Sequence, residues 1–217
     1  MPSLTLEGVA RRGIYVEITI DADLEDVWAL TQRPGEHGRW DLRFSQIVPA
    51  GMTEAGAARF TYTRQVPFHT VAGVGVSLGE ASRPDGSRTS AWRFGTSDRL
   101  SPIRAGRGYW RYIPVDGGIR FITGYDYTPG WGRMPDLVVR PILGWVTAWS
   151  FDRLRIWIER GEAPERWPLR SVLWFWQPGR PRAARCRRAP ADGSRRDDHL
   201  RDAPATLASL PAPEQIR

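Results

Sequence analysis

Residues Arg133–Arg160 carry the strongest pattern in this sequence, RMPDLVVRPILGWVTAWSFDRLRIWIER. Their apolar residues recur at steps of three and four, as they do along one side of a helix. These residues are Leu137, Val138, Ile142, Trp145, Val146, Trp149, Leu154, Ile156 and Trp157. Gly161 suits a left-handed stop directly after this stretch. Pro141 interrupts the pattern and is expected to kink the helix or to split off its first turn. The stretch predicts one long helix whose apolar side needs a partner.

The chain ahead of this helix has the pattern of an antiparallel sheet. Ile14–Ile20 alternates apolar and polar residues and predicts a strand. Leu24–Gln32 predicts a short amphipathic helix, and Pro34–Trp40 a turn or a second short helix. Six further strands are expected, at 42–49, at 57–65, at 69–82, around Trp92, at 104–115 and at 119–128. The prediction is an α+β fold in which a curved antiparallel sheet wraps around the long C-terminal helix and encloses a cavity.

Two turns set the expected strand registers. Residues 83–87, RPDGS, fit a type I turn closed by a glycine bulge, which places Leu78 opposite Trp92 and Val76 opposite Phe94. The turn at 116–118, DGG, brings one set of side chains to the inner face. That set is Trp110, Tyr112, Phe121, Thr123 and Tyr125, and the outer face receives Arg107, Arg111 and Arg120. The arginine positions agree with the register that the turn predicts.

Aromatic residues gather on the expected inner faces, and they are the main functional signal. The candidate ligand-binding residues are Phe60, Tyr62, Trp92, Phe94, Trp110, Tyr112, Phe121, Thr123 and Tyr125 from the sheet, with Trp145 and Trp149 from the long helix. Such a set is typical of a pocket for a mostly apolar small molecule. Ordinary core packing is the alternative interpretation.

Three segments together resemble a known superfamily: IYVEITIDADLEDVWALTQRPGEHGRWD after residue 13, RFITGYDY in the last strand, and GWVTAWSFDRLRIWIERG at the closing helix. They are similar to the helix-grip fold of the START-like (SRPBCC) superfamily, of polyketide cyclase/dehydrase and lipid-transport type, over residues 14–161. The resemblance implies binding of a hydrophobic small molecule such as a lipid or a polyketide, for carriage or for sensing. The alternative that it implies is a polyketide-cyclase-like enzyme that uses the same cavity. The superfamily has no shared catalytic motif to carry over.

Acid/base catalysis would need a positioned base and a donor in the cavity. His69, at the start of a strand, and Asp126, near the end of the last strand, are the candidates. We expect no metal and no cofactor, because His37, His69 and His199 are far apart in the sequence and Cys186 is the single cysteine.

The remaining segments differ in composition from the domain. Residues 1–13 are expected to be an extension, 162–177 a tryptophan- and arginine-rich segment, and 178–217 a disordered tail. The net charge is +7, and residues 161–217 carry 11 arginines against 7 acidic residues. Residues 166–177, RWPLRSVLWFWQ, suit the surface of an anionic membrane or a helix docked on the domain. A nucleic-acid partner is not expected, and neither a signal peptide nor a membrane span is evident. We therefore expect a cytoplasmic protein, with the inner membrane face as an alternative location.

Overall fold

The computed structural model describes residues 13–190. Its elements are β1 (Ile14–Ile20), α1 (Leu24–Gln32), α2 (Pro34–Trp40), β2 (Gln46–Met52), β3 (Ala58–Val66), β4 (His69–Ser82), β5 (Arg88–Gly95), β6 (Ile103–Val115), β7 (Gly118–Pro129), α3 (Arg133–Arg160), and the short helices η1 (Pro164–Arg166), η2 (Leu169–Leu173) and η3 (Ala183–Arg185). The predicted order of one strand, two short helices, six strands and a long helix is confirmed.

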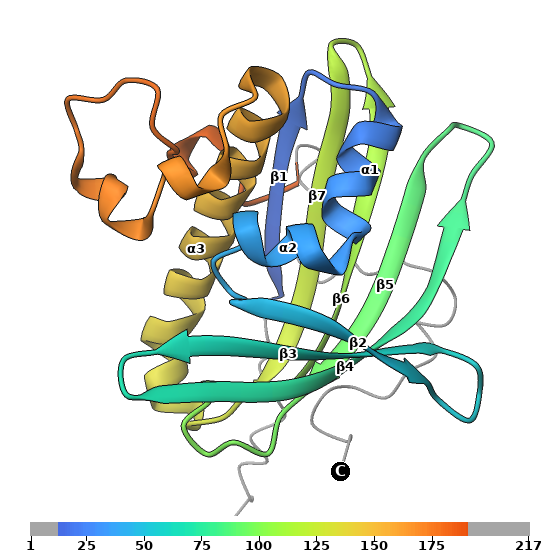
Figure 1. Cartoon of the computed structure of the whole chain (residues 1–217), viewed down its shortest axis with the longest axis vertical. Helices are drawn as coiled ribbons and strands as arrows, with labels where there is room; N and C mark the ends of the chain where they lie inside the picture. Colours follow the sequence, from blue (N-terminus) through green and yellow to red (C-terminus); the bar gives the residue numbers. More distant parts are fainter. Residues whose placement is uncertain (1–12, 191–217) are drawn as a thin grey trace, which may run out of the picture.

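All seven strands form one antiparallel sheet in the order β1-β7-β6-β5-β4-β3-β2. The sheet is strongly curved, because β3 and β4 run across one end of the molecule before β4 bends upward beside β5 (Figure 1). The glycines of β4, HTVAGVGVSLGEAS, favour this bend, because glycine within a strand often marks a tight bend. Sheet curvature leaves a concave face, which α3 and α2 cover.

The register of the β6–β7 hairpin is the predicted one. Tyr112 pairs with Phe121, and Trp110 pairs with Thr123. Residues directly opposite each other in an antiparallel pair share a face, so these side chains all point to the concave side. Arg107 pairs with Asp126 on the opposite, convex side of the sheet.

The register of the β4–β5 hairpin was predicted correctly only near its turn. Gly79 pairs with Ala91 as expected, but a bulge at Leu78 then shifts the register by one residue. Trp92 therefore lies opposite Ser77 rather than Leu78, and Phe94 lies opposite Gly75 rather than Val76. Gly79 has a φ of +126°, which only glycine adopts readily, and this permits the bulge.

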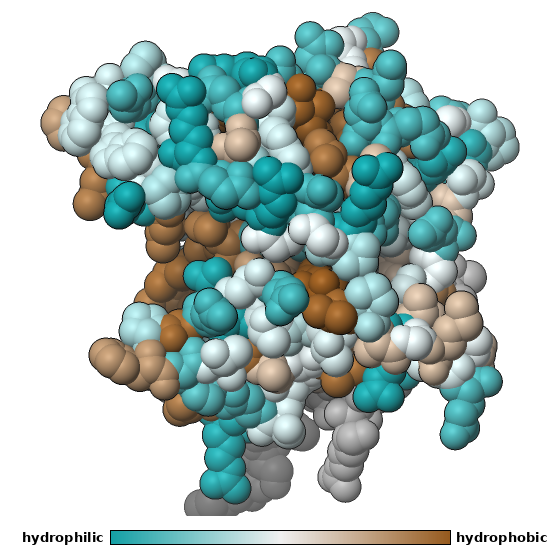
Figure 2. Space-filling view, in the orientation of Figure 1, coloured by the Kyte–Doolittle hydropathy of each residue, from teal (hydrophilic) through white to brown (hydrophobic). Residues whose placement is uncertain are grey.

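The helix α3 is continuous through Pro141 and ends at Arg160, where Gly161 caps it with a φ of +67°. The predicted split of its first turn does not occur. From Gly144 onward α3 lies directly on the sheet, where Phe151 stacks on Phe121 with ring centroids 4.5 Å apart. Its first half is largely exposed. Figure 2 shows apolar surface over α3 along the left flank of the molecule.

The strand β2 begins at Gln46, four residues later than the predicted start at residue 42. The residues directly before β2 lie outside the sheet, where they contact α3 and one another. The Leu42 N–H donates to Ser150 Oγ at 3.1 Å, and the Arg43 guanidinium binds the Asp41 carboxylate. Partners outside the sheet therefore override the strand propensity of this segment.

The chain after α3 folds back on the domain further than the sequence suggested. Arg187 and Glu17 of β1 exchange two backbone N–H···O=C hydrogen bonds, both with an N···O distance of 2.9 Å. The Arg182 N–H and the Arg185 guanidinium bind the buried Asp152 carboxylate of α3. The predicted disordered tail therefore does not include residues 178–190. Residues 191–217 and 1–12, with His199, lie outside the described part of the chain. Within residues 13–190, no helix has the length and apolar character that crossing a bilayer requires.

Candidate functional site

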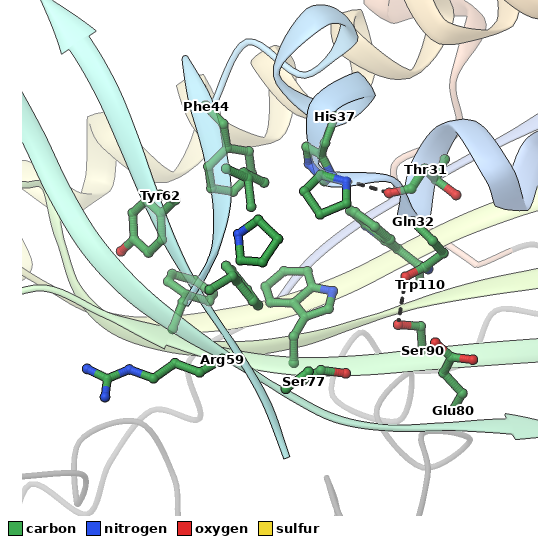
Figure 3. A pocket seen from close by; sticks show the side chains of 17 residues that line it. Thr31, Gln32, His37, Phe44, Arg59, Tyr62, Ser77, Glu80, Ser90 and Trp110 are labelled. Carbon is green, nitrogen blue, oxygen red and sulfur yellow. Dashed lines mark hydrogen bonds between the residues drawn. The ribbon is translucent and has the colours of Figure 1, made fainter. Parts of the chain in front are cut away.

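A pocket of about 290 Å³ lies between α1 and α2 on one side and strands β2–β6 on the other (Figure 3). It is lined by Thr31, Gln32, Pro34, His37, Phe44, Ile47, Pro49, Ala58, Arg59, Phe60, Tyr62, Ser77, Glu80, Ser90, Trp92, Phe94 and Trp110. The helix α3 contributes none of these residues. The void is therefore displaced from the long helix toward the outer strands of the sheet.

The aromatic side of the pocket is a chain of rings in mutual contact. Centroid distances are 5.6 Å for Phe44–Tyr62, 6.4 Å for Tyr62–Phe94, 5.3 Å for Phe94–Trp92 and 5.9 Å for Trp92–Trp110. Most of these pairs meet edge to face or tilted, which is the favoured geometry for aromatic rings. Burial raises the pKa of Tyr62 to about 12, so its hydroxyl stays neutral at physiological pH.

Glycines in β4 make room for two of these rings. A Cβ added to Gly75 would lie 2.1 Å from the Phe60 ring, and one added to Gly73 would lie 2.2 Å from the Tyr62 ring. Both rings of β3 therefore lie flat against the bare backbone of the next strand. Any larger residue at these glycines would displace a ring that lines the pocket.

Polar groups gather at the opposite end of the pocket, beside α1. The Gln32 amide nitrogen donates to the Tyr112 hydroxyl at 3.0 Å, and its oxygen accepts from Ser90 at 3.4 Å. The Tyr112 hydroxyl also bonds with Thr31 at 2.6 Å. Glu80 lies opposite Ser90 in the sheet, and within residues 13–190 its carboxylate has no hydrogen-bond or ion-pair partner. This end therefore offers acceptors and a negative charge.

The wall beside α2 is a buried ion cluster. The His37 ring stacks on Trp110 at 4.8 Å, and both of its nitrogens face acceptors, the Thr31 carbonyl at 3.3 Å and the Asp41 carboxylate at 3.1 Å. Asp41 is fully buried, and burial alone would raise its pKa. The charge of Arg43, at 2.6 Å, together with hydrogen bonds from His37 and Arg43 outweighs burial and holds that pKa well below its usual value. His37 therefore has no free ring nitrogen to offer a ligand in the pocket.

Five of the predicted ligand-binding residues line this pocket: Phe60, Tyr62, Trp92, Phe94 and Trp110. Five others fill the solid core instead, namely Tyr112, Phe121, Thr123, Tyr125 and Trp149. Trp145 is partly buried and packs against that core. These six side chains do not reach the void because the second half of α3 packs directly onto β1 and β7.

The two predicted catalytic residues lie apart from each other and outside the pocket lining. His69 binds Asp98 at 2.7 Å, at the turn between β3 and β4. Asp126 faces Arg107 on the convex side of the sheet, where burial outweighs the charge of Arg107 and raises its pKa. Neither has the position of an acid or base for a ligand in this pocket.

The pocket residues from α1, α2 and the linker after them were not predicted from the sequence. Gln32, His37 and Phe44 are polar or isolated in the sequence, and no periodic pattern marks them. The one available signal was the placement of the two short helices directly after β1, where they must cover the sheet. Within residues 13–190, no group of three or more His, Cys, Asp or Glu residues is placed to hold a metal ion.

A curved antiparallel sheet, two short helices after its first strand and a long C-terminal helix define the helix-grip class of α+β proteins. Residues 11–155 match the family model described as "Polyketide cyclase / dehydrase and lipid transport". The chain belongs to this family, within the START-like superfamily that its sequence resembles.

One curated relative is the Bacillus subtilis protein called "Uncharacterized membrane protein YndG", which is 38% identical over 172 residues. The match covers 76% of this chain but only 64% of that protein's length.

Among solved structures, a STAR-related lipid transfer protein from Xanthomonas axonopodis has a TM-score of 0.51 at 16% identity, with 66% of this chain and 84% of that chain covered. Human StAR-related lipid transfer protein 5 has a TM-score of 0.51 at 13% identity, with coverages of 67% and 74%. The di-domain ARO/CYC StfQ of the steffimycin pathway has a TM-score of 0.52 at 10% identity, with coverages of 69% and 51%. Likeness at such identities shows the shared fold alone.

Proposed function

We propose that the protein binds a mostly apolar small molecule, such as a lipid or a polyketide, in the pocket between α2 and the outer strands, and that it carries or senses this molecule. The observation that carries the proposal is an aromatic wall around about 290 Å³ of space, with Gln32, Glu80 and Ser90 gathered at one end (Figure 3). This volume is near the lower limit of about 300–1,000 Å³ for ligand pockets, so a single chain or a small ring system fits best. The family description and the two lipid transfer proteins of the same fold support this ligand class.

The polar end fixes the expected orientation of the ligand. Gln32 and Ser90 offer oxygen acceptors, and the unpaired Glu80 carboxylate lies beside them. In Figure 3 these residues lie on the side away from Phe44 and Tyr62, while the Arg59 guanidinium points out of the pocket. A head group that donates hydrogen bonds, such as a hydroxyl or an amine, therefore belongs at the Glu80 end, and the apolar body belongs against the rings.

Native mass spectrometry of the full chain as purified tests the binding function. We expect a bound species of small mass that organic solvent extracts. The uncharged probe N-phenyl-1-naphthylamine should then bind the extracted protein saturably, because its rings match the aromatic wall. A protein with no bound species and no saturable probe signal would contradict the proposal.

Competition among three amphiphiles of equal chain length tests the orientation separately. Dodecylamine and dodecanol should displace the probe at lower concentration than dodecanoate, because the negative carboxylate of dodecanoate would be repelled by the Glu80 carboxylate. Glu80→Gln should reduce the advantage of dodecylamine by about fivefold, the limit for a largely exposed ion pair. Glu54→Gln, at an exposed turn between β2 and β3, is the matched control. Equal displacement by all three amphiphiles would leave binding intact but refute the orientation.

A polyketide-cyclase-like reaction in the same pocket is the second candidate function. The unpaired Glu80 carboxylate favours it, because acid/base chemistry needs a free group beside the substrate. His37 has both ring nitrogens occupied, and the originally expected His69 and Asp126 lie outside the lining. If a poly-β-ketone substrate is found, Glu80→Gln should abolish its conversion and preserve its binding. Loss of conversion in His69→Ala or Asp126→Asn with retention in Glu80→Gln would reverse this assignment.

We also propose a peripheral position at a membrane surface, on the cytoplasmic side. The name of the Bacillus subtilis relative supports it. The segment 166–177, which the sequence suggested for this contact, exposes Leu173, Phe175 and Trp176. It buries Trp167 and Ser171 against the domain, so it serves at least in part as a docked cover.

A further inference from the structure

Six of the exposed large apolar side chains of the described chain lie in three segments at one end of the molecule. The segments that meet there are the β3–β4 turn, the β5–β6 loop and the start of α3. We call Phe68, Leu100, Trp131, Met134, Leu137 and Val138 the end patch; all six are exposed. Figure 1 shows the three segments together at the lower left, and Figure 2 shows apolar surface above them along α3.

Hydrogen bonds hold these three segments to one another. His69, next to Phe68, binds Asp98 at 2.7 Å and so ties the β3–β4 turn to the β5–β6 loop. The Gly130 N–H donates to the Pro102 carbonyl at 2.7 Å and ties that loop to the segment before α3. The end patch is therefore one braced surface rather than a set of separate loop tips.

The patch has features that a folded protein normally avoids in water. Met134, Leu137 and Val138 follow helical spacing on one side of α3, so they form a continuous apolar strip. Phe68 is fully exposed and has a φ of +65°, which a bulky residue rarely adopts. Exposed apolar surface of this kind marks an interaction site.

The charge around the patch identifies the partner. Arg99 and Arg133 are exposed and, among the residues that the structure describes, have no carboxylate partner. The acids of the same segments already have partners, because Asp98 binds His69 and Asp136 binds Arg140. Apolar side chains with a tryptophan and free arginines at their border suit the interface of a bilayer that carries negative lipid.

Resting on the peripheral membrane position proposed above, we propose that the end patch is the surface by which this protein docks on an anionic membrane. The first half of α3 lies in the plane of the interface, with Phe68 and Met134 inserted between lipid head groups. Arg99 and Arg133 contact the phosphates. The segment 166–177 is the less suitable surface, because Arg166 pairs with Glu162 and Trp167 is buried.

Flotation of the full chain with vesicles tests the proposal. We expect binding to vesicles of equal parts phosphatidylcholine and phosphatidylglycerol, and much weaker binding to phosphatidylcholine alone. Met134→Glu should lower the partition coefficient about tenfold to a hundredfold, since it removes one inserted apolar side chain. Arg133→Gln should lower it about fivefold.

The chain offers closely matched controls. Met52 is 74% exposed and Met134 is 77% exposed, but Met52 pairs with Ala58 at the start of β3, whereas Phe68 of the end patch follows the other end of that strand. Leu173 is 74% exposed and Leu137 is 70% exposed. Met52→Glu and Leu173→Glu should therefore leave binding unchanged, while Leu137→Glu should weaken it. All four positions are exposed, and thermal melts should confirm that each variant folds.

Three outcomes would overturn the proposal. The first is that the full chain does not float with anionic vesicles, or binds both vesicle types equally. The second is that Leu173→Glu releases the protein and Leu137→Glu does not, which places the contact in 166–177. The third is self-association in sedimentation velocity that Met134→Glu abolishes, without vesicle binding, which makes a second copy the partner.

Discussion

Replacing Asp41 by asparagine should unfold this protein more readily than any surface charge change. Asp41 is fully buried, and its carboxylate binds Arg43 at 2.6 Å and His37 at 3.1 Å. Asparagine keeps the shape of the side chain but leaves the charge of Arg43 without a counter-ion. The Arg43 side chain is only 10% exposed, so water does not replace that counter-ion. Breaking a buried pair in this way costs about 3–5 kcal/mol. Because His37 lines the pocket, the affinity for the apolar probe should fall as well.

Urea denaturation of Asp41→Asn and of Glu25→Gln measures this difference. Glu25 pairs with Arg88 at 2.9 Å, but its side chain is 71% exposed. Loss of an exposed pair costs about 0–1 kcal/mol. The predicted gap between the two variants is therefore at least about 2 kcal/mol in the free energy of unfolding. Equal losses would refute the view that the Asp41 cluster organises the wall of the pocket.

The pH dependence of stability gives an independent check. The folded pKa of Asp41 lies below its ordinary value of 3.8, because Arg43 and His37 together outweigh burial. The folded state therefore holds fewer protons than the unfolded state near this pH, and the contribution of Asp41 is complete above about pH 4. That contribution should decrease as the pH falls further, and the decrease should be absent in Asp41→Asn.

Three further predictions concern the core and the docking of residues 178–190 on the domain. Phe121→Ala should lower the free energy of unfolding by about 3–5 kcal/mol in urea titrations, because the ring is fully buried and stacked; a loss below about 1 kcal/mol would mean that the core is not packed as described. Burial raises the pKa of the Cys186 thiol, which donates a hydrogen bond to the Ala148 carbonyl. A thiol reagent should therefore react only with the unfolded protein. Rapid reaction with the native protein would contradict the docking of residues 178–190 on the domain. Arg185→Ala should lower the free energy of unfolding by about 1.5–3 kcal/mol, since it removes a charged partner from the buried Asp152. An unchanged melting temperature would show that residues 178–190 do not dock on the domain in solution.

The order of strands and helices along the chain and one hairpin register could be predicted, because local patterns fix them. The turn at 116–118 sets the pairing of Tyr112 with Phe121, and this register continues along the hairpin to Ala105. The bulge at Leu78 could not be predicted, because it depends on Gly79 adopting a positive φ within a strand. The docking of Arg182, Arg185 and Arg187 was also hidden, since their partners Asp152 and Glu17 are remote in the sequence.

The site was half predictable for a related reason. Alternation along strands identifies which side chains point inward, and this found Tyr62, Trp92 and Trp110. It does not say which inward side chains meet another side chain and which meet a void. Phe121 and Trp149 are in the core because α3 lies over them, and His37 is in the pocket because α2 lies to one side of that helix.

Titration of two tryptophan variants with N-phenyl-1-naphthylamine tests the location of the binding site. Ser77 lies in the pocket lining opposite Trp92, and Ser82 is exposed at the far end of the same strand. Ser77→Trp should fill the void and abolish saturable binding, while Ser82→Trp should bind as the wild type does. Full binding by a folded Ser77→Trp protein would contradict a ligand site between α2 and the outer strands.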